Sequence, residues 1–212
     1  MARTSSSRYF FIAILVFATS AAFAQEKGDA LREYRLGNYE NAVAICLSEL
    51  EAAPANMDSY AVLCWSLIKL GKYDEVATRA TEARKLNRYD PRLVEALAEA
   101  RYYQGHNAEA LKLFQEYADL APEGGRIDSA FYFMGELFIR MGRFRHADIA
   151  LTTAVRYVSG DAVWWTRLGY ARENAGEMRH AVTAYERALA LNPQSEDAKR
   201  GLDRSKRAMP VR

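Results

Sequence analysis

The sequence predicts an all-α fold in which pairs of antiparallel helices repeat along the chain and stack as a solenoid. Three regularities support this prediction. Glycines recur at a fixed spacing, apolar residues recur every three or four positions before each glycine, and a small or β-branched residue stands five positions after each one. The glycines are Gly37, Gly71, Gly105, Gly142 and Gly176. Neighbouring glycines are 34 residues apart, except for an interval of 37 between the third and the fourth.

The composition is that of a chain that can bury a core. Of 212 residues, 50% are hydrophobic and 26% are charged, and only five are prolines. These values exclude a disordered polyampholyte and a collagen-like chain. The formal net charge of +2 argues against binding nucleic acid through bulk positive charge, so no nucleic-acid partner is expected.

Residues 1–24 form a candidate export signal that precedes the fold. Arg3 and Arg8 give it a basic start, residues 9–17 are apolar, and a small-x-small pattern ends at Ala24. We expect cleavage between Ala24 and Gln25 and export to the periplasm of a bacterium, with no stable membrane insertion afterwards. The apolar stretch of about 15 residues is short for a spanning helix, which needs about 20. An uncleaved anchor in the inner membrane remains the alternative.

The apolar residues before each glycine predict the first helix of each unit. In the second unit they are Tyr60, Leu63, Cys64, Leu67 and Leu70. This spacing places them in one stripe on a helix. The glycine then supplies the left-handed residue that ends the helix.

The small residue after each glycine predicts where the second helix packs closely on another backbone. Ala42, Val76, Ala110, Ala147 and Ala181 occupy this position. Prolines then stop three of the second helices, at Pro54, Pro122 and Pro193. Good N-caps mark several helix starts. These are Asp90, which Pro91 follows, and Asp128, Asp161 and Ser195.

These signals divide the chain into five units and a terminal helix. The units are predicted at residues 25–56, 57–90, 91–124, 128–161 and 162–195. The longer interval falls at residues 123–126, where two adjacent glycines predict a turn. We expect a longer connection there, or alternatively a hinge between a three-unit and a two-unit half. Residues 196–212 are predicted to form a capping helix and a short tail, because the last unit of a solenoid needs a polar cover.

The units resemble tetratricopeptide repeats, whose period is 34. The fifth unit carries the fullest match, at Trp165, Leu168, Gly169, Gly176, Ala181, Tyr185, Ala188 and Pro193. It departs at Arg172, where the family favours tyrosine. The resemblance covers residues 25–195 and implies a right-handed superhelix of about five units. It also implies a concave face, lined by the first helix of each unit, that grips a peptide or a partner protein.

The resemblance places a set of aromatic and charged residues on this concave face. The expected protein-binding residues are Trp65, Lys69, Glu95, Glu99, Tyr102, Tyr103, Tyr132, Glu136, Tyr170 and Glu173. The set lacks the Lys/Asn/Lys/Arg arrangement by which chaperone-binding members hold a terminal carboxylate. Its glutamates disfavour such a ligand, and its aromatic rings favour protein contact. We therefore expect a partner with basic and apolar residues.

The sequence favours a non-enzymatic adaptor. It contains no phosphate-binding glycine loop, no HExxH and no plausible nucleophile elbow, and no metal or cofactor is expected. Two other functions remain open: a self-associating structural component of an envelope assembly or solute-transport accessory complex, and a carrier of a small apolar ligand. Cys46 and Cys64 lie on apolar helical faces, where a disulfide is permitted after export but a free thiol also fits.

Overall fold

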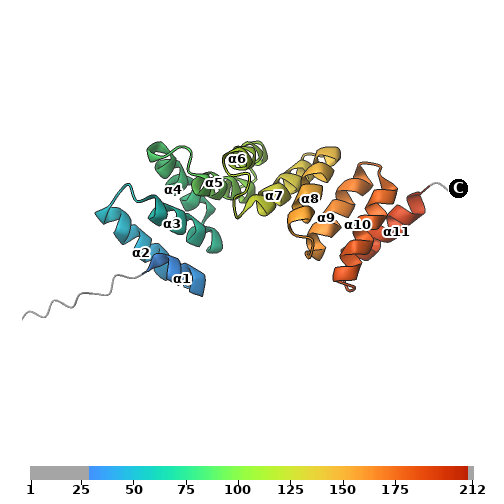
Figure 1. Cartoon of the computed structure of the whole chain (residues 1–212), viewed down its shortest axis with the longest axis horizontal. Coiled ribbons are helices and arrows are strands. Elements are labelled where there is room, and N and C mark those ends of the chain that lie inside the picture. Colours follow the sequence, from blue (N-terminus) through green and yellow to red (C-terminus); the bar gives the residue numbers. More distant parts are fainter. Residues whose placement is uncertain (1–28, 210–212) are drawn as a thin grey trace, which may run out of the picture.

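The computed structural model describes residues 29–209, and the predicted export signal lies outside them. This part of the chain is all-α, with eleven helices and no strand (Figure 1). The helices are α1 (Ala30–Leu36), α2 (Tyr39–Ala52), α3 (Met57–Lys69), α4 (Tyr73–Leu86), α5 (Pro91–Tyr103), α6 (Asn107–Leu120), α7 (Ile127–Arg140), α8 (Phe144–Tyr157), α9 (Ala162–Asn174), α10 (Met178–Leu191) and α11 (Glu196–Ala208). They confirm the predicted series of five helix pairs and a terminal helix.

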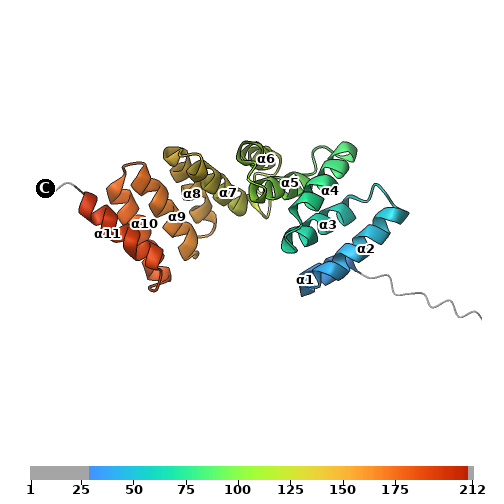
Figure 2. The same cartoon turned by 180° about the vertical axis from the view of Figure 1, so that it is seen from behind.

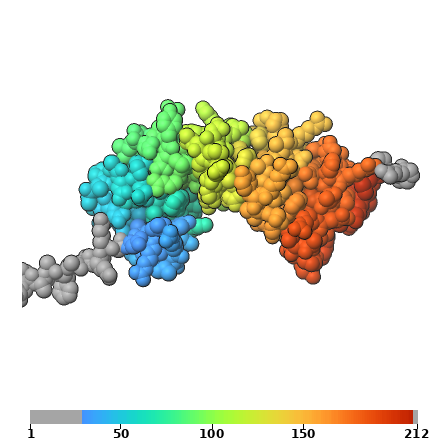
Figure 3. Space-filling model, in the orientation of Figure 1, coloured from blue at the N-terminus to red at the C-terminus, as the bar shows by residue number. Residues whose placement is uncertain are grey.

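The helix pairs follow one another along an arch, which both cartoon views show (Figures 1 and 2). The backbones of successive odd-numbered helices approach one another, whereas those of successive even-numbered helices in the described chain stay farther apart. The Arg84 side chain of α4 nevertheless reaches Glu116 of α6. Elements on the inside of a curved stack lie closer together than those on the outside. The odd-numbered helices therefore line the concave side, and the hollow beneath the arch is visible in Figure 3.

The repeated glycines end the first helix of each pair, as the sequence predicts. All five adopt positive φ, from 69° at Gly142 to 86° at Gly176. After α3, the Lys72 N–H donates to the Leu67 carbonyl (2.9 Å) and the Gly71 N–H donates to the Ile68 carbonyl (3.0 Å). This is a Schellman cap, which satisfies the last carbonyls and reverses the chain into the second helix.

Three of the four predicted N-caps are confirmed, and one is wrong. Asp90, Asp161 and Ser195 cap α5, α9 and α11 with their side-chain oxygens. Asp128 is not a cap, because α7 begins at Ile127, whose side chain is buried. The Arg126 N–H instead donates to the Tyr117 hydroxyl (3.2 Å), which fixes the start of α7 from the preceding helix pair.

The connection between the third and fourth units is longer than the others and closely packed. A Cβ on Gly124 would lie 2.5 Å from the Tyr117 hydroxyl oxygen and 2.9 Å from the Ala121 Cβ, so only glycine fits there. One hydrophobic core runs from Ala30 to Ala184 without a break at this connection. The longer connection is therefore as predicted, and the same core lies on both sides of it.

The core is built where small residues let backbones approach. The small residues five positions after each glycine are fully buried, at Ala42, Val76, Ala110, Ala147 and Ala181. A Cβ on Gly169 of α9 or on Gly201 of α11 would lie within 2.7 Å of the Tyr185 side chain, which comes from α10. Tyr185 thus fills the space between α9, α10 and α11, which attaches the capping helix to the last pair.

The two cysteines are free thiols inside this core. Cys46 on α2 and Cys64 on α3 have no exposed surface. Burial raises the pKa of each thiol to about 12, because a buried thiolate loses its hydration. Each therefore behaves as a small apolar side chain.

Candidate functional site

The ten residues predicted for the concave face all lie on odd-numbered helices. Trp65 and Lys69 come from α3, four residues from α5, two from α7 and two from α9. They differ in exposure. Lys69 and Tyr103 are exposed, and Trp65, Tyr132, Tyr170 and Glu173 are partly exposed. Glu95, Glu99, Tyr102 and Glu136 are buried. The expected site therefore divides into an accessible aromatic part and a buried acidic part.

The two glutamates of α5 share one arginine, which lies just before α7. The Arg126 guanidinium donates to Glu95 (Nε to Oε1, 3.0 Å) and to Glu99 (2.9 Å). Burial raises the pKa of Glu95 to about 7, while Arg126 opposes and Glu99 adds to this rise. Arg126 belongs to the additional residues before α7, so the longer connection supplies the cation that these two carboxylates need.

The same arrangement joins the later units. Arg167 on α9 donates to both oxygens of Glu136 on α7 (2.6 and 2.8 Å). Arg204 on α11 donates to both oxygens of Glu173 on α9 (2.7 and 2.9 Å). In each pair the arginine follows the glutamate by 31 residues. A residue 34 positions after the glutamate occupies the same place in the next unit. A spacing of 31 residues therefore places the arginine about one helical turn before that equivalent position.

These pairs correct the role that the sequence suggested for three glutamates. Glu95, Glu99 and Glu136 were expected to select cationic side chains of a partner. Their carboxylates are buried and already bonded to arginines of their own chain, so they have little surface to offer a partner. The groove instead exposes the guanidinium groups, with side-chain exposures of 47% for Arg126 and 32% for Arg167. Sequence reasoning missed these arginines, although the 31-residue spacing could have indicated them.

The aromatic part of the site is held by ring contacts. Tyr103 stacks on Tyr73 with 4.5 Å between ring centroids, and Tyr132 stacks on Trp164 at 4.8 Å. Trp65 lies 6.0 Å from the ring of Tyr34 on α1. Such contacts favour one orientation of each ring.

Cations also contact the rings. The Arg140 guanidinium lies 3.8 Å from the Tyr102 ring centroid, and the Arg167 guanidinium lies 5.2 Å from that of Tyr170. Arg140 additionally donates to the Tyr102 carbonyl oxygen (3.1 Å). The middle of the concave face is therefore a surface of fixed rings and arginines above buried carboxylates.

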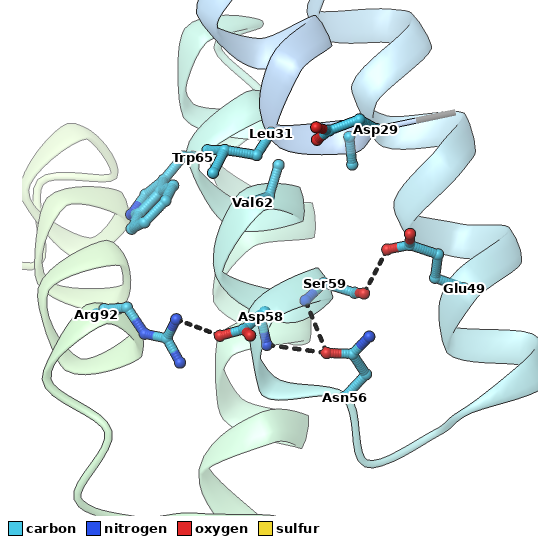
Figure 4. Close-up of a pocket in the computed structure, with 10 residues that line it drawn as sticks. Asp29, Leu31, Glu49, Asn56, Asp58, Ser59, Val62, Trp65 and Arg92 are labelled. Atoms are coloured by element: carbon cyan, nitrogen blue, oxygen red, sulfur yellow. Dashed lines mark hydrogen bonds and ion pairs between the residues drawn. The ribbon is translucent and has the colours of Figure 1, made fainter. Parts of the chain in front are cut away.

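A pocket of about 480 Å³ lies at the N-terminal end of the concave face. Leu31, Val62 and Trp65 form an apolar side, and Asp29, Glu49, Asp58 and Arg92 are among the polar residues around it (Figure 4). A second pocket, of about 310 Å³, lies between α9 and α11 beside Arg167, Tyr170 and Arg204. Both sizes are in the range of pockets that hold side chains or small ligands.

The described residues offer no obvious metal chemistry. No group of three or more His, Cys, Asp and Glu side chains within residues 29–209 is placed to hold an ion. Every helix in this range is also too short or too polar to cross a bilayer.

Comparison with known proteins identifies the family. Two models described as tetratricopeptide repeat match residues 17–132 and 134–202. The chain belongs to the tetratricopeptide repeat family. This repeat fold is an all-α superhelix, as observed, and the family resemblance found in the sequence is confirmed.

Curated relatives share the repeats over part of their length. A peroxisomal targeting signal receptor of Pichia angusta is 29% identical over 188 residues, which is 78% of this chain and 31% of the receptor. Anaphase-promoting complex subunit 7 of Arabidopsis thaliana is 25% identical over 168 residues, 79% of this chain and 30% of the subunit. The tetratricopeptide repeat chain thus spans about a third of the length of these relatives.

Solved structures show the same fold at low identity. MamA superimposes with a TM-score of 0.68 at 18% identity, over 79% of this chain and 96% of that one. TTC0263, a tetratricopeptide repeat protein of Thermus thermophilus, gives 0.58 at 17% identity, over 84% and 94%. A chain of the Cut9-Hcn1 complex gives 0.71 at 18% identity, over 83% and 35%. The arrangement of helix pairs in this tetratricopeptide repeat protein is therefore shared with all three.

Proposed function

We propose that this tetratricopeptide repeat protein is a non-enzymatic scaffold that binds an extended segment of a partner protein along its concave face. The observation that carries the proposal is the row of fixed, accessible rings on the odd-numbered helices. These rings are Trp65, Tyr103, Tyr132 and Tyr170. Aromatic residues supply much of the binding energy at protein interfaces, because they offer large contact area for few rotatable bonds.

The charge of the groove supports contact by rings rather than by bulk attraction. Arg126 pairs with Glu95 and Glu99, Arg167 pairs with Glu136, and Arg204 pairs with Glu173. Arg140 adds one further cation beside Tyr102. Four arginines therefore match four glutamates along the concave face from α5 to α11. A neutral groove lined with rings suits apolar and aromatic side chains of a partner. The names of the curated relatives, a targeting signal receptor and a complex subunit, agree with a role in protein recognition.

We also propose that the scaffold works in the periplasm, in or beside an envelope complex, on the strength of the signal pattern in residues 1–24. Mass spectrometry of the chain recovered from a periplasmic fraction tests this proposal. A chain that begins at Gln25 supports it. A chain that retains residues 1–24 in the membrane fraction supports the anchored alternative.

Site-specific photo-crosslinking in the cells of origin tests the groove. A photoreactive amino acid replaces Tyr103 on α5 or Val163 on α9, both exposed on odd-numbered helices. Matched controls carry it at Leu86 on α4 and Ile149 on α8, which are exposed on even-numbered helices. We expect a discrete partner adduct from the inner positions alone.

Adducts from Leu86 and Ile149 but not from Tyr103 and Val163 would place the interface on the outer side. Adducts between two copies of the chain at the inner positions would identify self-association. Sedimentation of the purified chain over a range of concentrations then distinguishes these outcomes, because only self-association changes with protein concentration alone.

A further inference from the structure

The pocket at the N-terminal end of the groove differs from the middle of the groove in its charge. Asp58 shares Arg92 with Asp90: the guanidinium donates to Asp58 (2.6 Å) and makes two bonds to Asp90 (3.0 and 2.7 Å). These bonds raise the pKa of Arg92 above its usual value. The single positive charge of Arg92 is thus already divided between two carboxylates.

Two further carboxylates of this pocket bond to neutral groups of the described chain. Asp29 accepts the Arg32 backbone N–H (3.0 Å) as the N-cap of α1. Glu49, at the end of α2, accepts the Ser59 hydroxyl (2.6 Å). Neither of these bonds supplies a positive charge. The pocket therefore carries an excess of negative charge, unlike the middle of the groove, where arginines balance the glutamates.

The apolar side of the pocket faces these carboxylates. Figure 4 shows the Trp65 ring and Leu31 across from Asp29 and Glu49, with Val62 between them. Among residues 29–209, the first helix, α1, has seven residues, whereas α3 has 13. Within this described range, the end of α2 and the start of α3 border the pocket through Glu49, Asn56 and Asp58.

We propose that this pocket receives a lysine or arginine side chain of the partner segment. The alkyl part of the side chain lies against Leu31, Val62 and the Trp65 ring, and its charge meets Asp29 and Glu49. A cation beside an indole face and carboxylates is bound by both, because the ring quadrupole and the charges act in the same direction. This inference rests on the proposed function, since it names one anchor point of the segment that the groove holds.

Charge complementarity decides the occupant. An acidic or terminal carboxylate group would meet like charge at Asp29 and Glu49. A purely apolar side chain would bury the charges of these two carboxylates without a cation, which is unfavourable. A basic side chain with an alkyl stem satisfies both sides of the pocket. The sequence raised the expectation of a basic and apolar partner from Glu95, Glu99 and Glu136. This inference moves the basic contact from the middle of the groove to its N-terminal end.

The test uses the chain from Gln25 to Arg212 and a capped pentapeptide probe with lysine between two leucines. The ¹H–¹⁵N spectra of the protein, recorded as the probe is added, follow the signals of the Trp65 indole and of the Leu31 and Ser59 amides. We expect saturable shifts at these three positions. A probe with norleucine in place of lysine should bind about tenfold more weakly, because it keeps the alkyl stem and loses the charge.

Two isosteric double variants separate the pocket from general charge. Asp29→Asn with Glu49→Gln keeps both hydrogen bonds as acceptors and removes both charges, and it should weaken lysine-probe binding by about tenfold. Glu40→Gln with Glu51→Gln removes the same charge from exposed positions of α2 that do not line the pocket. This control should leave binding unchanged.

Four results would overturn the inference. The first two are equal binding of the lysine and norleucine probes, and equal weakening by the two double variants. The third is tighter binding of spermidine than of the peptide. The fourth is tighter binding of the lysine probe to a Lys27→Gln variant than to the parent, as expected when a competing internal side chain is removed. The third assigns the pocket to a small cation, and the last assigns it to the chain's own lysine. If crosslinking from Tyr103 and Val163 succeeds while these results appear, the proposed function stands and this inference fails. Loss of the crosslinks refutes the proposed function itself.

Discussion

Arg167 on α9 binds Glu136 on α7 with two hydrogen bonds, of 2.6 and 2.8 Å, across the boundary between two consecutive repeats. The carboxylate is buried and the guanidinium is partly exposed. A solenoid is held by contacts between neighbouring units alone. This pair therefore ties the fourth unit to the fifth, and it also removes Glu136 from the set of residues that a partner can reach.

Arg167→Met should destabilise the fold, because it leaves the Glu136 carboxylate buried without a cation. We expect the free energy of unfolding to fall by about 2–3 kcal/mol, less than the 3–5 kcal/mol of a fully buried pair because solvent reaches Arg167. Urea unfolding followed by circular dichroism measures the change.

The double variant Glu136→Leu with Arg167→Met is the control for this pair. It replaces both charges by apolar side chains and should recover most of the lost stability, since the buried charge is gone. If the double variant loses as much stability as Arg167→Met and Glu136→Leu lose separately and added together, the residues are not coupled and the pair does not join the repeats.

Glu95 should make stability depend on pH. Burial raises its pKa in the folded chain to about 7, from 4.5. Between these values the folded chain binds more protons than the unfolded chain, so the free energy of unfolding falls as pH rises from about 4.5 to about 7 and levels off above that. The slope from this group is at most about 1.4 kcal/mol per pH unit.

Glu95→Gln removes this titration and keeps an acceptor for Arg126. Stability measured from pH 4.5 to pH 8 should therefore vary less in the variant than in the parent, and the variant should be the more stable at pH 8. Glu40→Gln, at an exposed position, should leave the parent profile unchanged. Parallel profiles for the parent and Glu95→Gln would show that Glu95 is ionised throughout.

The helix pairs could be predicted because their signals are local. Gly71 ends α3 through a backbone conformation that its own lack of a Cβ permits, and Val76 is buried because it faces the neighbouring backbone at a repeated position. Each signal recurs in five units, so an error in one unit would be corrected by the others. Asp128 failed as a cap because Tyr117, from the preceding unit, fixes the helix start.

The chemistry of the concave face could be predicted only in part. The sequence placed Tyr103 and Tyr132 on the inner helices, because the repeat phase determines which helix and which face they occupy. It did not show that Arg126 reaches Glu95 and Glu99, since that contact depends on how the additional residues before α7 fold. Pairs between units are tertiary contacts, and the pattern within one helix cannot reveal them.

Gly169→Ala tests the close packing of the last helix pair on its cap. A Cβ there would lie 2.7 Å from two ring atoms of Tyr185, which is buried between three helices. Overpacking of this kind costs about 1–3 kcal/mol, and the better helix propensity of alanine returns up to about 1 kcal/mol. We expect a net loss of about 1–2 kcal/mol by urea unfolding.

Gly160→Ala is the matched substitution, because a Cβ there meets nothing within 4 Å. It should change stability by less than about 0.5 kcal/mol, as most surface substitutions do. Equal losses for the two variants would mean that Tyr185 moves aside readily and that the contact does not hold α11 in place.

Cys46 and Cys64 should be unreactive in the folded chain. The thiolate is the reactive form, and burial raises the pKa of both thiols to about 12. Titration with Ellman's reagent at pH 8 should therefore find almost no reactive thiol in the native protein and two per chain in guanidinium chloride without reductant. A Ser48→Cys variant, which adds an exposed thiol on α2, should give one fast-reacting group and show that the reagent works on the native chain. If the unfolded, unreduced parent shows no thiol at all, the two cysteines form a disulfide in the isolated protein, and the packing between α2 and α3 differs from that described.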